Sequence, residues 1–274
     1  MVQRILIHPG FHKTGTSTIQ QFLWVNREAL LPHVAVLQLR HLKEPARMCM
    51  SFARSRNPLL LADLATELDG VLAENGLAAT DSRDILVSCE AISGHCPGWP
   101  GVDDYTTAPY TVSVVAGFFA ERFPGAEVLV VFTMREAEAW LNSAWRHHLA
   151  GQKLSEDYPA WSERMRPASD LMAVVVEAAE VLAPVQAFTI PIEEAAEHPL
   201  GPGGSLLELL SLPEEVRAGL EPIAHANTGP SPELAAELLR LNRSRLPKDG
   251  LERRKAALLK EAGVGGWVKR KTEG

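Results

Sequence analysis

The sequence predicts an α/β fold, a doubly wound and mainly parallel sheet flanked by helices, followed by a helical C-terminal part. Three observations predict it. Short apolar runs alternate with helical patterns along the first 195 residues. The run VLVVF at 128–132 is apolar on both faces, which suits a parallel sheet covered by helices on each side. After residue 195, Pro and Gly turns are followed only by helical stretches.

The predicted strands are apolar runs bounded by polar, Gly or Pro residues, at 5–7, 34–39, 85–87, 128–132 and 185–190. Between them, apolar residues recur at three- and four-residue steps, which predicts helices at 17–30, 58–74, 110–122, 136–150 and 169–182. Further helices are predicted at 204–220, 231–245 and 250–262. We therefore expect one domain over 1–274, with an α/β core at 1–195 and a helical extension at 196–274.

Composition narrows the class of protein. Of the 274 residues, 46% are hydrophobic and 22% charged, and no apolar run approaches the roughly 20 residues of a membrane-spanning helix. The first residues do not resemble a secretory signal, and three cysteines form no paired framework, which favours the cytoplasm and argues against zinc. The net charge of −7 argues against nucleic-acid binding and leaves room for a local basic pocket.

The segment ILIHPGFHKTGTSTIQ at 5–20 reads as a strand, a phosphate-binding loop and the start of a helix. Gly10 and Gly15 let backbone amides approach an anion, and the helix N-terminus adds its positive dipole end. Lys13 supplies a full charge, and hydroxyl donors follow at Thr14, Thr16 and Ser17. The alternative is an ordinary tight turn before a helix capped by Thr16 or Ser17.

The order of residues in this loop distinguishes classes of nucleotide-binding protein. The nucleotide-hydrolase signature GxxxxGK[ST] has Lys after the second Gly, whereas Lys13 precedes Gly15. The order HKTGTST resembles the 5′-phosphosulfate loop of the sulfotransferase family, including its bacterial members, which have a P-loop NTPase-like fold and use 3′-phosphoadenosine 5′-phosphosulfate (PAPS). The resemblance implies that Lys13 contacts the bridging oxygen of the leaving phosphate, and that residues 14–17 match the loop position by position.

A second motif lies in VLVVFTMREAEAWLNSAWRHHL, where Arg135 directly follows a strand and Ser143 comes eight residues later on a helix. It resembles the family's 3′-phosphate motif, in which an Arg binds phosphate oxygens and a Ser adds a hydroxyl donor. The family's C-terminal Arg-Lys-Gly segment has only a faint echo in GVGGWVKRK, with Trp267, Lys269 and Arg270.

Sulfonyl transfer also needs a base near Lys13 to accept the proton of the acceptor. Glu90 is the first candidate, because it follows a strand in ILVSCEAISG and resembles the Glu that is thought to act as base in heparan-type sulfotransferases and in bacterial relatives with an SxE segment. His12 is the rival base. His95, His147 and His148 are further possibilities, and the tryptophans stay unassigned.

Together these motifs predict a sulfotransferase that moves a sulfonyl group from PAPS to a hydroxyl or amine of a carbohydrate or small-metabolite acceptor, with adenosine 3′,5′-bisphosphate (PAP) as product and no metal. An ATP-dependent small-molecule kinase and a noncatalytic nucleotide-binding module are the alternatives. The sequence assigns neither the acceptor nor the oligomeric state. The C-terminal part at 231–274 either closes over the site as a lid or packs against a partner.

Overall fold

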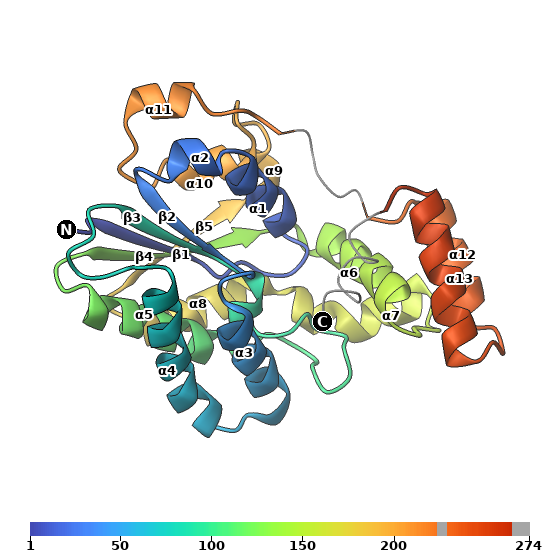
Figure 1. Ribbon diagram of the computed structural model, residues 1–274. Coiled ribbons are helices and arrows are strands. Elements are labelled where there is room, and N and C mark those ends of the chain that lie inside the picture. The colour runs from blue at the N-terminus through green and yellow to red at the C-terminus, as the bar shows by residue number, and fades with distance from the viewer. Residues whose placement is uncertain (224–228, 265–274) are drawn as a thin grey trace.

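The computed structural model describes residues 1–223 and 229–264, and within them it confirms the doubly wound parallel sheet flanked by helices (Figure 1). The strands are β1 (Arg4–His8), β2 (Val34–Gln38), β3 (Asp84–Ser88), β4 (Glu127–Met134) and β5 (Gln186–Pro191). Their order across the sheet is β2-β3-β1-β4-β5, and every neighbouring pair is parallel.

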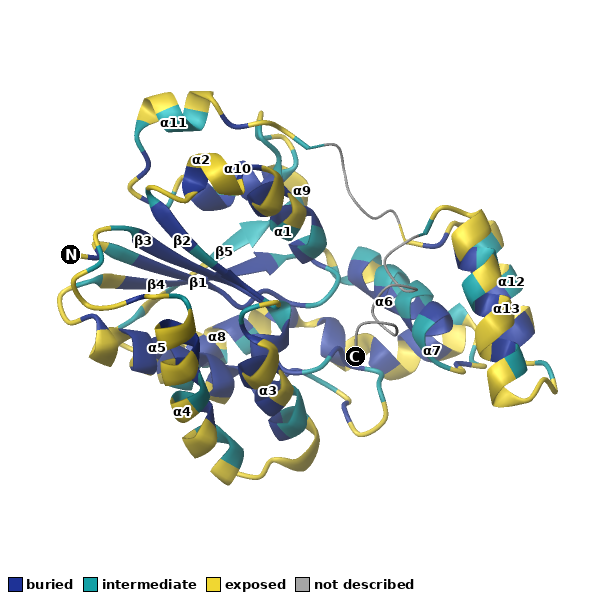
Figure 2. Cartoon of the chain, viewed as in Figure 1, coloured by how far each residue is buried: buried dark blue, intermediate teal, exposed yellow. Residues whose placement is uncertain are grey.

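The apolar runs become strands because their side chains fill two hydrophobic layers. Ile5 and Ile7 of β1 point into one layer and Leu6 into the other, which is the period-two alternation of a strand. All three side chains are fully buried, and Figure 2 shows the strands of the central sheet as mostly buried ribbon. A strand that is apolar on both faces therefore identifies a sheet with helices on both sides.

The helices form these two layers and a projecting arm (Figure 1). One face of the sheet is covered by α3 (Lys43–Ser55), α4 (Leu59–Glu74), α5 (Ala108–Arg122) and α8 (Leu171–Leu182), and the opposite face by α1 (Thr16–Val25), α2 (Arg27–Leu30) and α10 (Pro202–Leu207). The remaining helices are the 3₁₀ turns η1 (Glu90–Ser93) and η2 (Arg166–Ser169), with α6 (Ala137–Gly151), α7 (Tyr158–Met165), α9 (Ile192–Ala195), α11 (Glu214–Ala218), α12 (Pro232–Asn242) and α13 (Lys248–Glu261). No helix within 1–223 and 229–264 is long and apolar enough to cross a membrane.

The helix α6 extends beyond the sheet and begins the arm. The α12–α13 hairpin packs on α6 and is fixed there by buried polar contacts: Asn242 Nδ2 donates to the carbonyl of Leu149 at 3.2 Å, and Lys255 Nζ donates to the carbonyl of Gln152 at 2.8 Å. These residues belong to the predicted helical extension. A role for them as a lid stays a prediction.

Two predicted helices are interrupted in the structure. The helix expected at 17–30 is divided at Asn26, whose side chain bonds the backbone of Glu221. In place of the helix expected at 204–220 the structure has two helices, α10 and α11. The segment between them buries Leu210 and Leu212 in the second hydrophobic layer. Tertiary packing therefore overrides the local helical pattern in both places.

Chain direction changes in the middle of the sheet. From β1 the chain leads through α1 and α2 to β2 at one edge, and from β4 it leads to β5 at the other edge. Since β1 and β4 are neighbours, the loops after them diverge outside their carboxyl ends, where open parallel sheets form a crevice. Ligands of open parallel sheets bind at such a switch point.

Candidate functional site

The loop after β1 lies at this switch point and has an unusual backbone. Gly10, Lys13 and Gly15 all have positive φ, of 56°, 73° and 87°. A left-handed conformation costs a non-glycine residue roughly 1–2 kcal/mol, so Lys13 is strained where an ordinary turn would use Gly or Asn. Alternation of left-handed residues turns successive amides toward one side, which forms a concavity suited to an anion.

Both glycines are also required by close packing. A Cβ at Gly10 would lie 2.8 Å from Cγ2 of Thr16, and one at Gly15 would lie 2.4 Å from Cδ1 of Ile192. Gly15 is the N-cap of α1, so the cap residue has no side chain to bond the first turn, and no acidic residue stands in that turn. The positive end of the α1 dipole is therefore available to an anion, whereas Glu136, Asp157, Asp170 and Ser231 cap other helices.

The three predicted hydroxyl donors differ in where they lie. Ser17 is half-buried, and Thr16 is buried in the first turn of α1. The Thr14 hydroxyl faces the interior, where it donates to the carbonyl of Phe11 at 2.7 Å and lies 2.8 Å from Oγ1 of Thr133. Thr14 thus contributes to the shape of the loop, and contact of its hydroxyl with a phosphate stays a prediction.

Arg135 is brought to the loop although 122 residues separate it from Lys13. Its Nη1 donates to the carbonyl of Lys13 at 3.0 Å. Its Nε is buried and has no hydrogen-bond partner among the described residues. A buried guanidinium donor without an acceptor is costly, and an anion at this position would satisfy it. Ser143 lies half-buried on α6, and no hydrogen bond joins it to Arg135 within the described residues.

Glu90 begins η1 immediately after β3, the strand beside β1. Its Oε2 accepts a hydrogen bond of 2.6 Å from Nε2 of Gln20 on α1. This bond joins the candidate base to α1, the helix that follows the loop. Gln20 was not predicted, although it lies on the same helix as Ser17 and one turn later, where a polar side chain would face the same crevice.

His12, the rival base, is clamped from two sides. Its backbone N–H donates to the hydroxyl of Tyr105 at 3.0 Å, and its carbonyl accepts from Nε1 of Trp140 at 2.9 Å. Tyr105 is fully buried, which raises its pKa well above the usual range, so it remains protonated. Neither Tyr105 nor Trp140 was assigned from the sequence, because a buried aromatic residue with one polar contact gives the same pattern as a core residue.

The other candidate histidines occupy different surroundings. His95 stacks on His12, with ring centroids 6.3 Å apart, and burial followed by repulsion from His12 and Arg54 lowers its pKa to about 4. His148 is buried, 2.7 Å from the carbonyl of Pro97, and burial lowers its pKa to about 4. The contacts of His148 indicate a structural role, and His95 remains beside the site.

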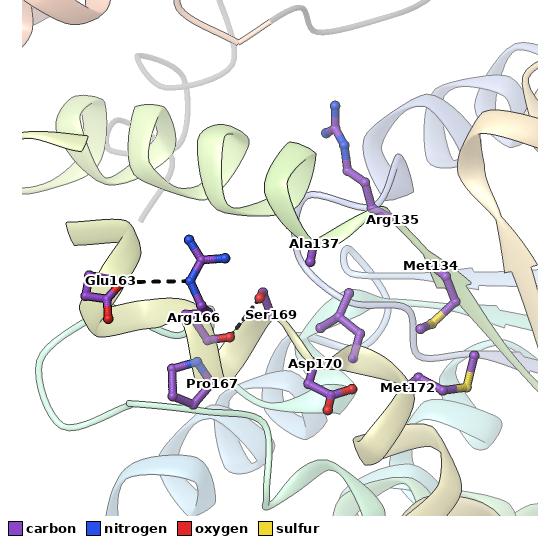
Figure 3. Close-up of a pocket in the computed structure, with 10 residues that line it drawn as sticks. Met134, Arg135, Ala137, Glu163, Arg166, Pro167, Ser169, Asp170 and Met172 are labelled. Atoms are coloured by element: carbon purple, nitrogen blue, oxygen red, sulfur yellow. Dashed lines mark hydrogen bonds and ion pairs between the residues drawn. The ribbon is translucent and has the colours of Figure 1, made fainter. Parts of the chain in front are cut away.

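A hollow of about 640 Å³ lies beside the end of β4 and is lined by Met134, Arg135, Ala137, Glu163, Arg166, Pro167, Ser169, Asp170, Leu171 and Met172. In Figure 3 the Arg135 guanidinium points away from the other lining side chains. Ser169 donates to the carbonyl of Arg166, and Arg166 pairs with Glu163 at 3.9 Å. These polar groups are thus used locally, and Arg135 is shared between this hollow and the predicted site.

Two predictions about this region are not decided by the structure. The basic segment with Trp267, Lys269 and Arg270 lies outside the described residues. Within 1–223 and 229–264, no cluster of three or more His, Cys, Asp or Glu side chains could hold a metal ion. That finding does not test whether catalysis uses a metal.

The fold and the loop define an α/β protein with a candidate anion-binding loop at the switch point of its sheet. No protein-family model matches the chain, and no curated protein matches it. A solved structure described as the sulfotransferase from Alicyclobacillus acidocaldarius aligns with 96% of this chain and 96% of its own, with a TM-score of 0.47 and 16% sequence identity.

Proposed function

We propose that the protein is a PAPS-dependent sulfotransferase acting on a hydroxyl or amine of a carbohydrate or small metabolite. One observation carries the proposal. Lys13 follows the central strand β1, Arg135 follows β4 on one side of it, and Glu90 follows β3 on the other. In-line transfer needs the leaving group and the base on opposite sides of the transferred group, and this strand order supports that arrangement.

In this proposal the residues share the chemistry as follows. The loop amides and Lys13 hold the 5′-phosphate and stabilise the negative charge that the leaving phosphate gains when its bond to sulfur breaks. Arg135, with its unpaired buried Nε, and Ser143 hold the 3′-phosphate. Glu90 accepts the proton that the acceptor oxygen or nitrogen loses as its bond to sulfur forms.

Glu90 is favoured over His12 as the base. Among the described residues, Gln20 is the one that donates a hydrogen bond to the Glu90 carboxylate, so lone pairs remain for an acceptor hydroxyl. Both the N–H and the carbonyl of His12 are held by buried aromatic residues, which suits a residue that shapes the loop. A positioned base contributes on the order of 10²–10⁴ in rate, so Glu90→Gln should reduce turnover by that factor and leave bisphosphate affinity nearly unchanged.

Calorimetric titration with adenosine 3′,5′-bisphosphate in the absence of metal tests the donor. We expect binding that Lys13→Met and Arg135→Met each weaken and that Lys43→Met, an exposed lysine at the start of α3, leaves unchanged. Binding of magnesium ATP without binding of the bisphosphate would instead support the kinase alternative.

Transfer of labelled sulfonate from PAPS to a panel of sugars and small alcohols tests the reaction. Glu127→Gln is the matched control, because Glu127 is a half-exposed carboxylate at the opposite end of β4 and pairs with Arg4. Bisphosphate binding with no transfer to any acceptor, and no effect of Glu90→Gln on slow hydrolysis of PAPS, would favour a noncatalytic nucleotide-binding module.

A further inference from the structure

A chain of buried polar groups runs beneath the loop and is not used in the chemistry above. His8, the last residue of β1, is fully buried. Its Nδ1 lies 3.0 Å from Oγ of Ser88 at the end of β3, and its Nε2 lies 3.2 Å from Oγ1 of Thr133 near the end of β4. Thr133 in turn lies 2.8 Å from Oγ1 of Thr14 in the loop. The ends of three neighbouring strands are thereby joined to the loop.

The direction of every hydrogen bond in this chain follows from its last member. The carbonyl of Phe11 can only accept, so the Thr14 hydroxyl donates to it at 2.7 Å. The single Thr14 proton is then used, so Thr133 donates to Thr14 and must itself accept from Nε2–H of His8. A neutral His8 has no proton on Nδ1, which accepts from the hydroxyl of Ser88.

Burial keeps His8 in this neutral form. Removal from water lowers its pKa to about 4, although the charge of Glu90 acts in the opposite direction. The ring also lies close to the loop, since a Cβ added to Gly10 would lie 3.2 Å from its Nε2. The contacts of His8 therefore complete the hydrogen-bonded chain and limit the space beneath the loop.

We propose that His8 is a positioning residue that acts through Thr133 and Thr14 to hold the loop at 9–15 in its anion-binding shape. The inference rests on the proposed function in so far as the anion is the 5′-phosphate of the donor. Because the chain is buried, loss of one link leaves an unsatisfied donor or acceptor and allows the loop to change shape.

Isosteric variants test the chain link by link. Thr133→Val removes one hydroxyl and should weaken binding of adenosine 3′,5′-bisphosphate about tenfold, the effect of one net hydrogen bond. His8→Leu should weaken it at least as much, and His8→Gln, which retains a donor near the position of Nε2, should recover part of the loss. Thr133→Ser keeps the hydroxyl and should bind within about twofold of the wild type.

Thr111→Val is the matched control. The Thr111 hydroxyl is equally buried and donates to the carbonyl of Ile92 at 2.6 Å, not to the loop. It should lower the free energy of unfolding much as Thr133→Val does and leave bisphosphate affinity unchanged. A folded Thr133→Val protein that binds the bisphosphate as tightly as Thr111→Val does would overturn the inference.

Nuclear magnetic resonance separates failure of the inference from failure of the proposed function. The His8 ring should show a proton on Nε2 in the free wild-type protein, and a proton on Nδ1 alone would overturn the chain. If the wild type does not bind the bisphosphate, amide hydrogen exchange at residues 10–15 still tests the positioning role. Faster exchange in Thr133→Val than in Thr111→Val supports the positioning role, and equal exchange refutes it.

Discussion

Replacement of Gly15 by alanine perturbs the loop in two separable ways. The residue has a φ of +87°, and its new Cβ would lie 2.4 Å from Cδ1 and 2.7 Å from Cγ1 of Ile192. The left-handed backbone costs an L-residue roughly 1–2 kcal/mol. Since Ile192 is half-buried and can shift its side chain, an off-rotamer χ adds about 1 kcal/mol. Gly15→Ala should therefore lower the free energy of unfolding by about 2–3 kcal/mol.

Gly125 offers a matched control for the backbone cost alone. Its φ is +92°, and a Cβ placed there would meet nothing within 4 Å. Gly125→Ala should lose only the roughly 1–2 kcal/mol of the left-handed conformation. In the double variant Gly15→Ala with Ile192→Ala, the shortened side chain at 192 should remove the clash with the new Cβ. A double-mutant cycle should measure this as a favourable coupling of about 1 kcal/mol.

Guanidinium denaturation followed by tryptophan fluorescence gives these free energies, and calorimetric titration gives the affinity for adenosine 3′,5′-bisphosphate. A displaced Gly15 removes amides from the phosphate, and each hydrogen bond to a charged group contributes about 1.5–3 kcal/mol, so affinity should fall at least tenfold. Gly125→Ala should bind normally. Equal stability and equal affinity in the Gly15 and Gly125 variants would refute both the packing of Ile192 on the loop and the role of the loop in binding.

Three histidines, the buried His8 and His148 and the half-buried His95, have a pKa lowered to about 4. Because the unfolded chain takes up these protons at higher pH than the folded protein, the free energy of unfolding should be constant above about pH 6.5 and fall toward pH 4, by ~3 kcal/mol for the fully buried His8 alone. Urea titrations should show a smaller loss for a His148→Gln protein. A free energy of unfolding that does not change with pH would contradict this. Trp140→Phe should lower the free energy of unfolding by about 1 kcal/mol more than Trp161→Phe and should weaken bisphosphate binding. Both indoles are fully buried, but within the described residues only Trp140 Nε1 bonds the loop. Equal losses in the two variants would refute the role of Trp140 in holding His12. Asp84→Asn should lower the free energy of unfolding by about 1–3 kcal/mol with normal binding, because both carboxylate oxygens accept backbone N–H groups at the amino end of the sheet; altered affinity would contradict this separation.

Much of the fold could be predicted because both faces of the sheet are covered. Strands buried on two faces are continuous apolar runs, and the confirmed strands lie within one or two residues of these runs wherever turn residues bound them. The helix α3 was not predicted, although Met48, Cys49 and Phe52 form its buried face at helical spacing. Its charged residues and Pro45 obscured the pattern, yet Pro45 stands in the first turn, where no helical hydrogen bond is lost.

The site could be predicted only in part, since its residues come together through the order of the strands. The loop sequence indicated an anion site, and the order of Lys13 and Gly15 indicated its class. That Arg135 donates to the carbonyl of Lys13 depends on β4 lying beside β1, which local sequence does not determine. The contacts of Tyr105 and Trp140 depend in addition on side-chain directions, so that neither clamp of His12 could be inferred.

A signal for the buried chain was nevertheless present at the ends of the strands. His8, Ser88 and Thr133 follow apolar runs at positions that the sheet buries, where a polar group is costly unless it is paired. An apolar residue at each of these positions could have been buried without a hydrogen-bond partner. Polar residues at the carboxyl ends of three neighbouring strands therefore indicate a shared hydrogen-bonded floor, and the loop above it is the segment whose shape that floor controls.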